Sequence, residues 1–370
     1  HGPRGQMSPE ARTRHPFHMY DAIQGQPDTF ARMVQRHDGA LEALAARIAS
    51  AGRVFVVGTG TSHHAALIGE HLLRVYGGDV AVHAYPAFDF ALYGPPLGAR
   101  DWVIGISHRG NKNYTVQSLA RARAAGCSTA LVTGEGNPDG RAEADAVFHT
   151  VAQEQSSTHT ISYIAAIAVL STLAGHLGHR RTGARILPKR VLSDDVPAAL
   201  REALTREADA AAWARTHVGR RRIWLSGGGP SAVTALEIAL KIKEAAYLGA
   251  EGMPIETFLH GPFQCAAPED LFVLIAPAGA AQERVAALGG MVADIGAAYL
   301  AVGDAARHPL QAGAAGWCAV PPVPEPFTAL TCLVPLQLFA YHLALVRGTN
   351  PDGFRLDDPR FAKARARIQL

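Results

Sequence analysis

The segment from Ser231 to Tyr247 places acid–base side chains at helical spacing, and it is the clearest candidate for chemistry in this sequence. Its apolar pattern predicts a helix. At about 100° per residue four polar side chains project from one side: Thr234, Glu237, Lys241 and Glu244. Leucine and isoleucine cover the other sides, so the polar side is expected to face a cavity inside the protein. The alternative is a ladder of surface ion pairs, each worth roughly a few tenths of a kcal/mol.

A histidine follows this predicted helix at a turn. His260 lies sixteen residues beyond Glu244, within Leu259-His-Gly-Pro262. A carboxylate, an amine and an imidazole suit proton transfer next to a carbonyl group. The second half of the chain therefore predicts a site for acid–base chemistry on a small phosphorylated molecule.

Two turns in the first half are candidates for binding the phosphate. They are Gly58-Thr-Gly-Thr-Ser62 and Ser107-His-Arg-Gly-Asn-Lys112, and each follows a short apolar run. A turn between a strand and a helix presents backbone N–H groups and the positive end of the helix dipole, while Arg109 and Lys112 add charge. The alternatives are a plain tight turn and a solvated loop. His63 stands where a dinucleotide-binding motif has its third glycine, so that motif is not predicted.

No metal or cofactor is predicted. The chain has no H-E-x-x-H motif, and the adjacent His63 and His64 lie on a predicted helix, where neighbouring side chains diverge. The cysteines stand far apart without a C-x-x-C pair, which argues against a zinc ribbon, a redox pair and a secreted disulfide scaffold. They are Cys127, Cys265, Cys318 and Cys332. We expect reduced thiols and a cytoplasmic location.

Strands alternate with helices along the chain, which predicts parallel sheets covered on both faces. Expected strands are 54–57, 80–85, 102–107 and 129–134 in the first half, with 222–226, 272–279 and 297–304 in the second. Expected helices include 65–76, 161–177, 231–247 and 327–346. The similar order of elements in the two halves indicates an internal duplication. The run 327–346 is long enough to span a membrane, but its polar residues favour a buried core helix.

Length and charge restrict the class of protein. The chain has 370 residues and a formal net charge of +3, which is too balanced for a protein that binds nucleic acid through phosphate neutralisation. The first six residues resemble an expression remnant, and the leader has no apolar core of a signal peptide. Only five of the 35 basic residues are lysine, so each retained lysine is a candidate for a role that needs an amine. They are Lys112, Lys189, Lys241, Lys243 and Lys363.

Long motifs in the second half resemble the isomerase half of glucosamine-6-phosphate synthase, a tandem of two sugar isomerase (SIS) domains. They are ALEIALKIKEAAYLGAEGMPIETFLHGP (235–262), VPLQLFAYHLALVRGTNPD (334–352) and DPRFAKARARIQL (358–370). The resemblance implies an α/β fold of two SIS-type subdomains, each a flavodoxin-like three-layer α/β/α unit. The expected parts are a leader at 1–18, helices at 19–50, the first SIS domain at 51–178, a helical connector at 179–218, the second SIS domain at 219–350 and a tail at 351–370. No counterpart of the family's glutaminase domain is recognised, so glutamine hydrolysis is not expected.

The resemblance also implies roles for individual residues. Glu244 matches the glutamate that moves a proton between C1 and C2 of the sugar, and Lys241 and Glu237 precede it on the helix. His260 matches a histidine that assists ring opening from the partner subunit, which implies a homodimer. Lys363 matches a lysine that forms a Schiff base with the keto sugar. Residues matching the phosphate and substrate loops are Gly60, Thr61, Ser62, Ser107, Ser157, Thr158 and Thr160.

Departures from the family pattern leave the substrate open. His108, Arg109 and Lys112 replace small hydroxyl residues, which predicts tighter binding of a phosphate or of a second anionic group. His159 lies in the substrate loop, and Ile161 replaces a lysine there. The sequence favours an aldose–ketose isomerase or an amino-sugar-phosphate deaminase. A deglycase and a non-catalytic sugar-phosphate sensor are the alternatives, and no contact with nucleic acid or membrane is expected.

Overall fold

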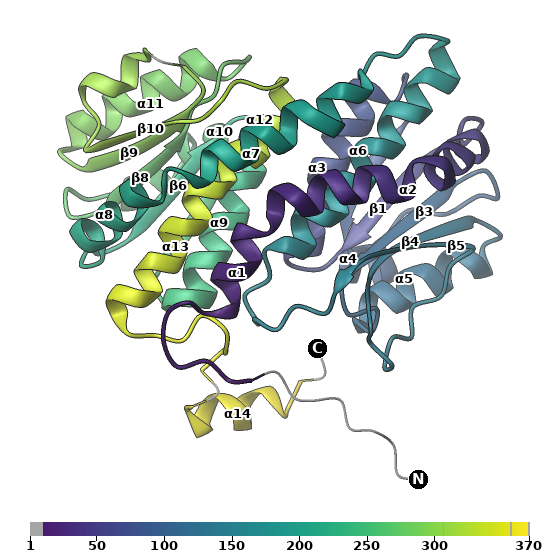
Figure 1. The fold of residues 1–370 in the computed structure, drawn as a ribbon, viewed down its shortest axis with the longest axis horizontal. Coiled ribbons are helices and arrows are strands. Elements are labelled where there is room, and N and C mark those ends of the chain that lie inside the picture. Colours follow the sequence, from purple (N-terminus) through teal and green to yellow (C-terminus); the bar gives the residue numbers. More distant parts are fainter. Residues whose placement is uncertain (1–9, 306, 356, 369–370) are drawn as a thin grey trace.

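The computed structural model describes residues 10–305, 307–355 and 357–368, and it contains two five-stranded parallel sheets. The first sheet has the order β2-β1-β3-β4-β5 and the second β10-β9-β8-β6-β7. Numbered within each half, both orders are the same, so the predicted duplication is confirmed in the topology. The first six residues, which we expected to be an expression remnant, lie outside the residues that the structure describes. Figure 1 shows the two sheets on opposite sides of the molecule, with helices against their faces.

The strands of the first sheet are β1 (Val54–Gly58), β2 (Val82–Pro86), β3 (Trp102–Ser107), β4 (Ser128–Glu135) and β5 (Ala146–Ala152). Those of the second are β6 (Ile223–Gly227), β7 (Ala250–Pro254), β8 (Leu271–Ile275), β9 (Ala298–Gly303) and β10 (Gly316–Ala319). The expected strands 54–57, 102–107 and 129–134 are confirmed. β5, β7 and β10 were not predicted, and each is an edge strand whose sequence lacks a continuous β-branched run.

The helices of the first half are α1 (His18–Gln24), α2 (Gln26–Ile48), α3 (Thr61–Tyr76), α4 (Ala87–Tyr93), α5 (Asn113–Ala124) and α6 (Ile161–Thr182). A π turn, η1 (Val191–Asp195), leads into α7 (Val196–Leu204) and α8 (Glu207–His217), as the predicted helical connector. The second half has α9 (Pro230–Ala246), α10 (Ile255–Leu259), α11 (Gln282–Ile295), α12 (Glu325–Thr331), α13 (Leu333–Arg347) and α14 (Pro359–Arg365). Short 3₁₀ turns are η2 (Pro262–Cys265) and η3 (Pro309–Ala312).

Two of these expectations need correction. Helix α3 begins at Thr61, so Thr61 and Ser62 form its first turn instead of ending a loop. The expected helix 327–346 is two helices, because the chain breaks at Cys332, three residues before Pro335, whose ring cannot supply an N–H to the preceding turn.

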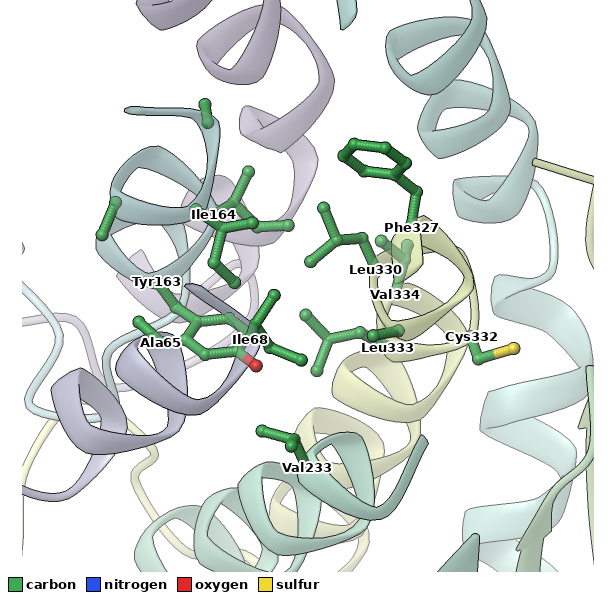
Figure 2. Packing of buried hydrophobic residues seen from close by; sticks show 14 of the residues in the cluster. Ala65, Ile68, Tyr163, Ile164, Val233, Phe327, Leu330, Cys332, Leu333 and Val334 are labelled. Atoms are coloured by element: carbon green, nitrogen blue, oxygen red, sulfur yellow. The ribbon is translucent and has the colours of Figure 1, made fainter. Parts of the chain in front are cut away.

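Two apolar segments are long enough to cross a membrane by length and composition, Ile161–Thr182 and Glu325–Arg347. In the structure 94% and 83% of their apolar windows are buried, so both serve as core helices. The core continues across the boundary between the halves: Figure 2 shows Ile68 of α3 and Ile164 of α6 facing Leu330 and Leu333 from α12 and α13. Helix α9 packs against both α3 and α13. The two halves therefore share one hydrophobic core beside α3 and α9.

The connections of the first sheet place a crevice between β1 and β3. From β1 the chain proceeds to β2 on one side, and later strands extend from β3 on the other side. In sheets of this kind ligands bind at this switch point, beyond the carboxyl ends of the strands. The turns after β1 and β3 are the two predicted anion-binding turns. At the first, a Cβ on Gly58 would lie 2.6 Å from the backbone of Ser62, so only glycine allows the helix to approach the strand this closely.

A matched pair of glycine substitutions tests this packing. A Cβ on Gly178 of α6 would lie 1.8 Å from the carbonyl oxygen of Tyr76, at the end of α3. A Cβ on Gly39, in the middle of α2, would meet no atom of the described residues within 4 Å outside its own stretch of helix backbone. We expect Gly178→Ala to lower the free energy of unfolding by about 1–3 kcal/mol through overpacking. Gly39→Ala should raise it by about 0.5–1 kcal/mol, because alanine favours a helix interior. Thermal melts of both variants check the prediction, and an unchanged Gly178→Ala protein would contradict the close contact.

Candidate active site

Helix α9 carries a buried ion cluster on the side predicted from the sequence. The side chains of Glu237 and Lys241 are 0% exposed, and that of Glu244, one turn further along the helix, is 21% exposed. Lys241 Nζ lies 2.6 Å from Glu244 Oε2 and 3.4 Å from Glu237 Oε1. A buried ammonium group between two carboxylates is not a surface ladder, so that alternative is wrong.

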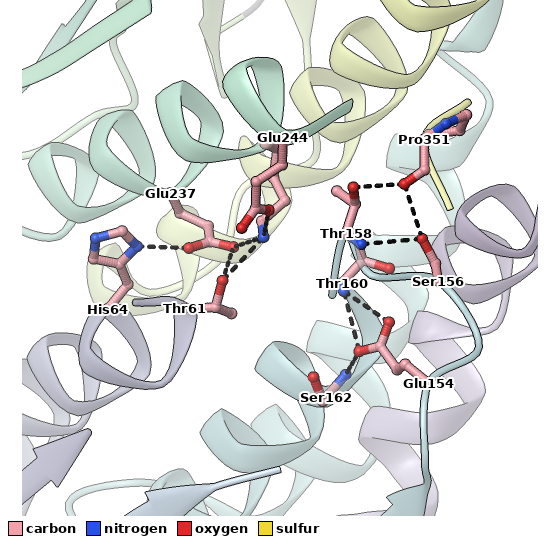
Figure 3. Close-up of polar contacts among 11 residues, drawn as sticks. Thr61, His64, Glu154, Ser156, Thr158, Thr160, Ser162, Glu237, Glu244 and Pro351 are labelled. Atoms are coloured by element: carbon pink, nitrogen blue, oxygen red, sulfur yellow. Dashed lines mark hydrogen bonds and ion pairs between the residues drawn. The ribbon is translucent and has the colours of Figure 1, made fainter. Parts of the chain in front are cut away.

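The cluster continues onto α3 in the other half of the chain. Lys241 Nζ donates to Thr61 Oγ1 at 3.0 Å, and the Thr61 hydroxyl donates to Glu237 Oε1 at 3.1 Å. His64 Nδ1 lies 2.6 Å from Glu237 Oε2. Figure 3 shows these side chains meeting from the two helices. Polar contacts therefore join the first turn of α3 to the charged side of α9.

The electrostatic setting separates the two carboxylates. Burial disfavours the charge of Glu237, but Lys241 and His64 outweigh it and lower the pKa of that carboxyl. At Glu244 burial dominates and raises the pKa, although Lys241 opposes it. Burial also works against the charge of Lys241, yet Glu237 and Glu244 raise the pKa of the amine to about 12. Glu237 thus stays the fixed anion that holds Lys241, while Glu244 is the carboxyl able to take up a proton.

A cavity of about 390 Å³ opens above this cluster. Ten of the predicted site residues line it: Gly60, Thr61, Ser62, His108, Arg109, Lys112, Ser157, His159, Lys241 and Glu244. Glu237 lies behind them and contacts Thr61 and Lys241 instead. The structure therefore places the predicted phosphate turns and the predicted proton-transfer residue around one space.

The end of the cavity near α3 and α5 favours an anion. The first residues of both helices line it, and helix N-termini attract negative charge. Arg109 and Lys112 border the same end, and neither has an ion-pair partner among the residues that the structure describes. Burial and the neighbouring Arg109 lower the pKa of Lys112, so an incoming anion would relieve both groups.

The loop at 155–160, which matches the family's substrate loop, is fixed by contacts with neighbouring segments. The Glu154 carboxylate accepts from the backbone N–H groups of Thr160 and Ser162, at 3.0 and 2.7 Å, and burial raises its pKa. Thr158 Oγ1 donates to the carbonyl of Pro351 at 2.7 Å. Thr158 and Thr160 therefore anchor the loop and do not line the cavity. Ser157, which precedes Thr158, and His159, which lies between the two threonines, do line it.

Ser107 and His108 make hydrogen bonds that hold the backbone around the site in place. Ser107 Oγ accepts from the backbone N–H of Gly110 at 3.1 Å, and this serine is buried below the turn, outside the cavity lining. His108 Nε2 accepts from the backbone N–H of Glu154 at 2.9 Å. The ring thereby ties the second anion-binding turn to the substrate loop. Burial, followed by the charge of Arg109, lowers its pKa to about 4, so it is neutral near pH 7.

Two predicted catalytic residues lie outside the cavity. His260 has a 76% exposed side chain, and its Nε2 lies 3.1 Å from Glu256 Oε2. Lys363 is exposed on α14. Phe354 and Ile368, from the same C-terminal segment as Lys363, do line the cavity. The roles implied for His260 and Lys363 therefore stay predictions.

Several residues of the site were missed from the sequence. His64 was considered only as a metal ligand, although its spacing of three residues from Thr61 places both on one side of α3. Glu154 has no motif around it that predicts a role, and Tyr163 and Phe354 are aromatic positions without a chemical signal in the sequence. Among the residues that the structure describes, no group of three His, Cys, Asp or Glu side chains is placed to hold a metal ion.

The fold and this site define a tandem of two sugar-isomerase-type units. A model of the SIS domain family matches residues 47–174 and 218–347, and the chain belongs to that family. It is 31% identical over 312 residues to the glutamine–fructose-6-phosphate aminotransferase (isomerizing) of Pyrococcus horikoshii. That match covers 81% of this chain and 50% of the relative, so the chain spans about half the length of the curated relative.

Solved structures show the same fold. The C-terminal domain of glucosamine-fructose-6-phosphate aminotransferase from Francisella tularensis superimposes with a TM-score of 0.84 at 18% identity, covering 93% of this chain and all of that one. Glucosamine-6-phosphate deaminase from Thermotoga maritima gives a TM-score of 0.73 at 19% identity, covering 92% and 98%. The predicted α/β fold of two SIS-type units is confirmed, as is the resemblance to the isomerase half of the aminotransferase.

The ion cluster makes a prediction about Glu244 that needs no substrate. The negative charge of Glu237 raises the pKa of Glu244, so Glu237→Gln should lower it. A ¹³C NMR titration of the side-chain carboxyl groups measures this, with Glu244→Gln identifying the signal. Glu256→Gln, which changes an exposed carboxylate on α10, is the control and should leave the titration of Glu244 unchanged. A Glu244 pKa that stays constant or rises in Glu237→Gln would contradict the cluster.

Proposed function

We propose that the chain binds a sugar phosphate in this cavity and moves a proton between C1 and C2 of the sugar, with Glu244 as the base. The observation that carries the proposal is the position of Glu244: a partly exposed carboxyl of raised pKa lines the same cavity as two helix N-termini and two cations, Arg109 and Lys112, that have no ion-pair partner in the described part of the chain. A base for enolisation needs a pKa near the working pH and access to the substrate carbon. Glu244 has that access, and burial shifts its pKa upward, the direction that this role requires.

The positive charges of Arg109 and Lys112, at the end of the cavity near α3 and α5, fit a phosphate monoester. Near neutral pH such a group carries a charge between −1.5 and −2, which Arg109 and Lys112 together balance. Ser62 and Thr61 add hydroxyl groups at the start of α3. A single phosphate therefore accounts for both cations, and the second anionic group considered from the sequence is not required.

The relatives support the class of reaction. The curated relative is named as an isomerizing aminotransferase that uses fructose 6-phosphate, and one structural neighbour is a glucosamine-6-phosphate deaminase. Isomerisation and deamination share the same proton transfer, so we propose both as reactions of this site. The proposal does not include glutamine hydrolysis. A deglycase or a sugar-phosphate sensor remains the competing function, and an active enzyme would exclude the sensor.

Four further expectations belong to this proposal. If His260 acts in the reaction, it must reach the cavity of another copy of the chain, because in its own chain it points to Glu256. A two-fold symmetric homodimer follows from that role. Lys363 would reach a bound sugar by movement of the C-terminal segment that already contributes Phe354 and Ile368. A cytoplasmic location, without nucleic acid or membrane partners, stays part of the proposal.

Removal of the base tests the proposed function. Glu244→Gln should lower kcat at least about 100-fold, the usual contribution of general acid–base catalysis, while the sugar phosphate still binds. In the wild-type enzyme kcat/KM should fall as the pH decreases through the raised pKa of Glu244, because a protonated carboxyl cannot accept a proton. NMR assays of C1/C2 interconversion and ammonia release, with fructose 6-phosphate and glucosamine 6-phosphate among a panel, provide the measurement. Full activity of Glu244→Gln would refute the mechanism.

The phosphate end has its own test. Arg109→Ala should raise KM about tenfold or more and change kcat less, because it removes binding that is the same in the ground and transition states. Arg180→Ala, at an exposed position near the end of α6, is the matched control and should change neither constant. Equal KM values for Arg109→Ala and the control would show that Arg109 does not bind the substrate.

A further inference from the structure

His159 is an imidazole in the cavity for which the proposed mechanism has so far given no role. Its ring lines the cavity, and no hydrogen bond to it is found among the described residues. The edge-to-face contact with His108, at 5.1 Å between ring centroids, holds it from one side. A polar ring that borders a cavity without a protein partner is free to bind a ligand.

The backbone on both sides of His159 is held in place. The N–H of Thr158 donates to Ser156 Oγ at 3.2 Å, and the hydroxyl of Thr158 donates to the carbonyl of Pro351. The N–H of Thr160 donates to the Glu154 carboxylate. Figure 3 shows the contacts of Thr158 and Thr160 with Ser156, Pro351 and Glu154. The imidazole is therefore presented to the cavity by a segment that has little freedom to move it away, which is the requirement for a pre-organised donor.

Basic groups from both ends of the cavity act on the ring of His159. The basic groups that act on its ring are His108, Lys241, Arg109 and Lys112, of which Lys241 belongs to the cluster with Glu244 and the other three to the phosphate end. Burial and these groups lower the pKa of His159 to about 2. The ring is neutral at any working pH, so it carries one N–H donor and does not compete with Glu244 as a base.

We propose that His159 donates a hydrogen bond to the carbonyl oxygen of the substrate while Glu244 removes the proton from the adjacent carbon. The electron pair of that C–H bond forms the C1–C2 double bond, and the carbonyl π pair moves onto the oxygen that His159 contacts. His159 keeps its proton. The neighbouring hydroxyl then gives its proton to that oxygen, Glu244 returns the first proton to the other carbon, and the isomerised sugar results. This role rests on the proposed function and deepens it.

A neutral imidazole suits this task for a physical reason. The developing negative charge on the oxygen is stabilised by a donor already aimed at the site, without reorganisation of water. An imidazolium in the same place would repel the adjacent cations that hold the phosphate. A neutral N–H donor stabilises the enediolate oxygen and still allows Arg109 and Lys112 to stay charged beside it.

Two substitutions of His159 distinguish a hydrogen-bond donor from a side chain that only fills space. His159→Leu removes the N–H donor, and His159→Gln keeps one on a side chain of similar reach. Loss of one such donor should lower kcat of His159→Leu by about 100- to 1,000-fold, and the glutamine variant should recover at least about tenfold of that loss. The dissociation constant of inorganic phosphate, measured by calorimetry, should change less than about threefold in both variants, because the phosphate end is untouched.

A stable mimic of the enediolate gives a second readout. A hydroxamate of a phosphorylated sugar acid should bind His159→Leu about 100-fold more weakly than wild type, in parallel with kcat. Wild-type kcat in His159→Leu, or equal loss of phosphate and hydroxamate affinity, would overturn the role of His159. A wild-type protein that turns over no sugar phosphate would instead overturn the proposed function, so the two failures are distinguishable.

Discussion

A buried ammonium group is the constraint on which the site depends. Lys241 is fully buried, and an unpaired charge there would cost several kcal/mol. It is tolerated because Glu237 lies one turn before Lys241 and Glu244 one turn after it on the same side of α9, and because Thr61 approaches from α3. The same contacts fix the distance between the two halves of the chain. They also leave Glu244 as the carboxylate of the cluster that lines the cavity, beside Thr61 and Lys241, while Glu237 lies outside the lining.

The two halves have the same topology but contribute different chemistry. Each sheet has a switch point flanked by glycine turns, yet the cavity described here borders the turns after β1 and β3 of the first half. The second half contributes the charged side of α9. The cavity is lined from both halves, and the polar contacts of Thr61 and His64 with the α9 cluster lie where α3 meets α9. A duplicated fold thus acquires one composite site by specialisation of its two copies.

Sequence patterns predicted the strands and helices that short stretches of the chain determine by themselves. Continuous β-branched runs identified the central strands, and the periodicity of α9 identified Glu237, Lys241 and Glu244. The edge strands β5, β7 and β10 were missed because an edge strand needs neither two apolar faces nor a long run. His64 was missed because its partner, Glu237, lies 173 residues away in sequence. The exposed positions of His260 and Lys363 show the same limit, since the roles implied for them depend on another copy of the chain and on movement of the tail.

The exchange of substrate hydrogen with solvent tests the central claim most directly. If Glu244 removes a proton from the sugar and returns it, some of those protons are replaced by solvent while they reside on the carboxyl group. Wild-type protein incubated with fructose 6-phosphate or glucosamine 6-phosphate in D₂O should therefore incorporate deuterium at C1 or C2, as detected by ¹H NMR, at a rate that scales with turnover. Equal deuterium incorporation by wild type and Glu244→Gln would contradict the proton-transfer account.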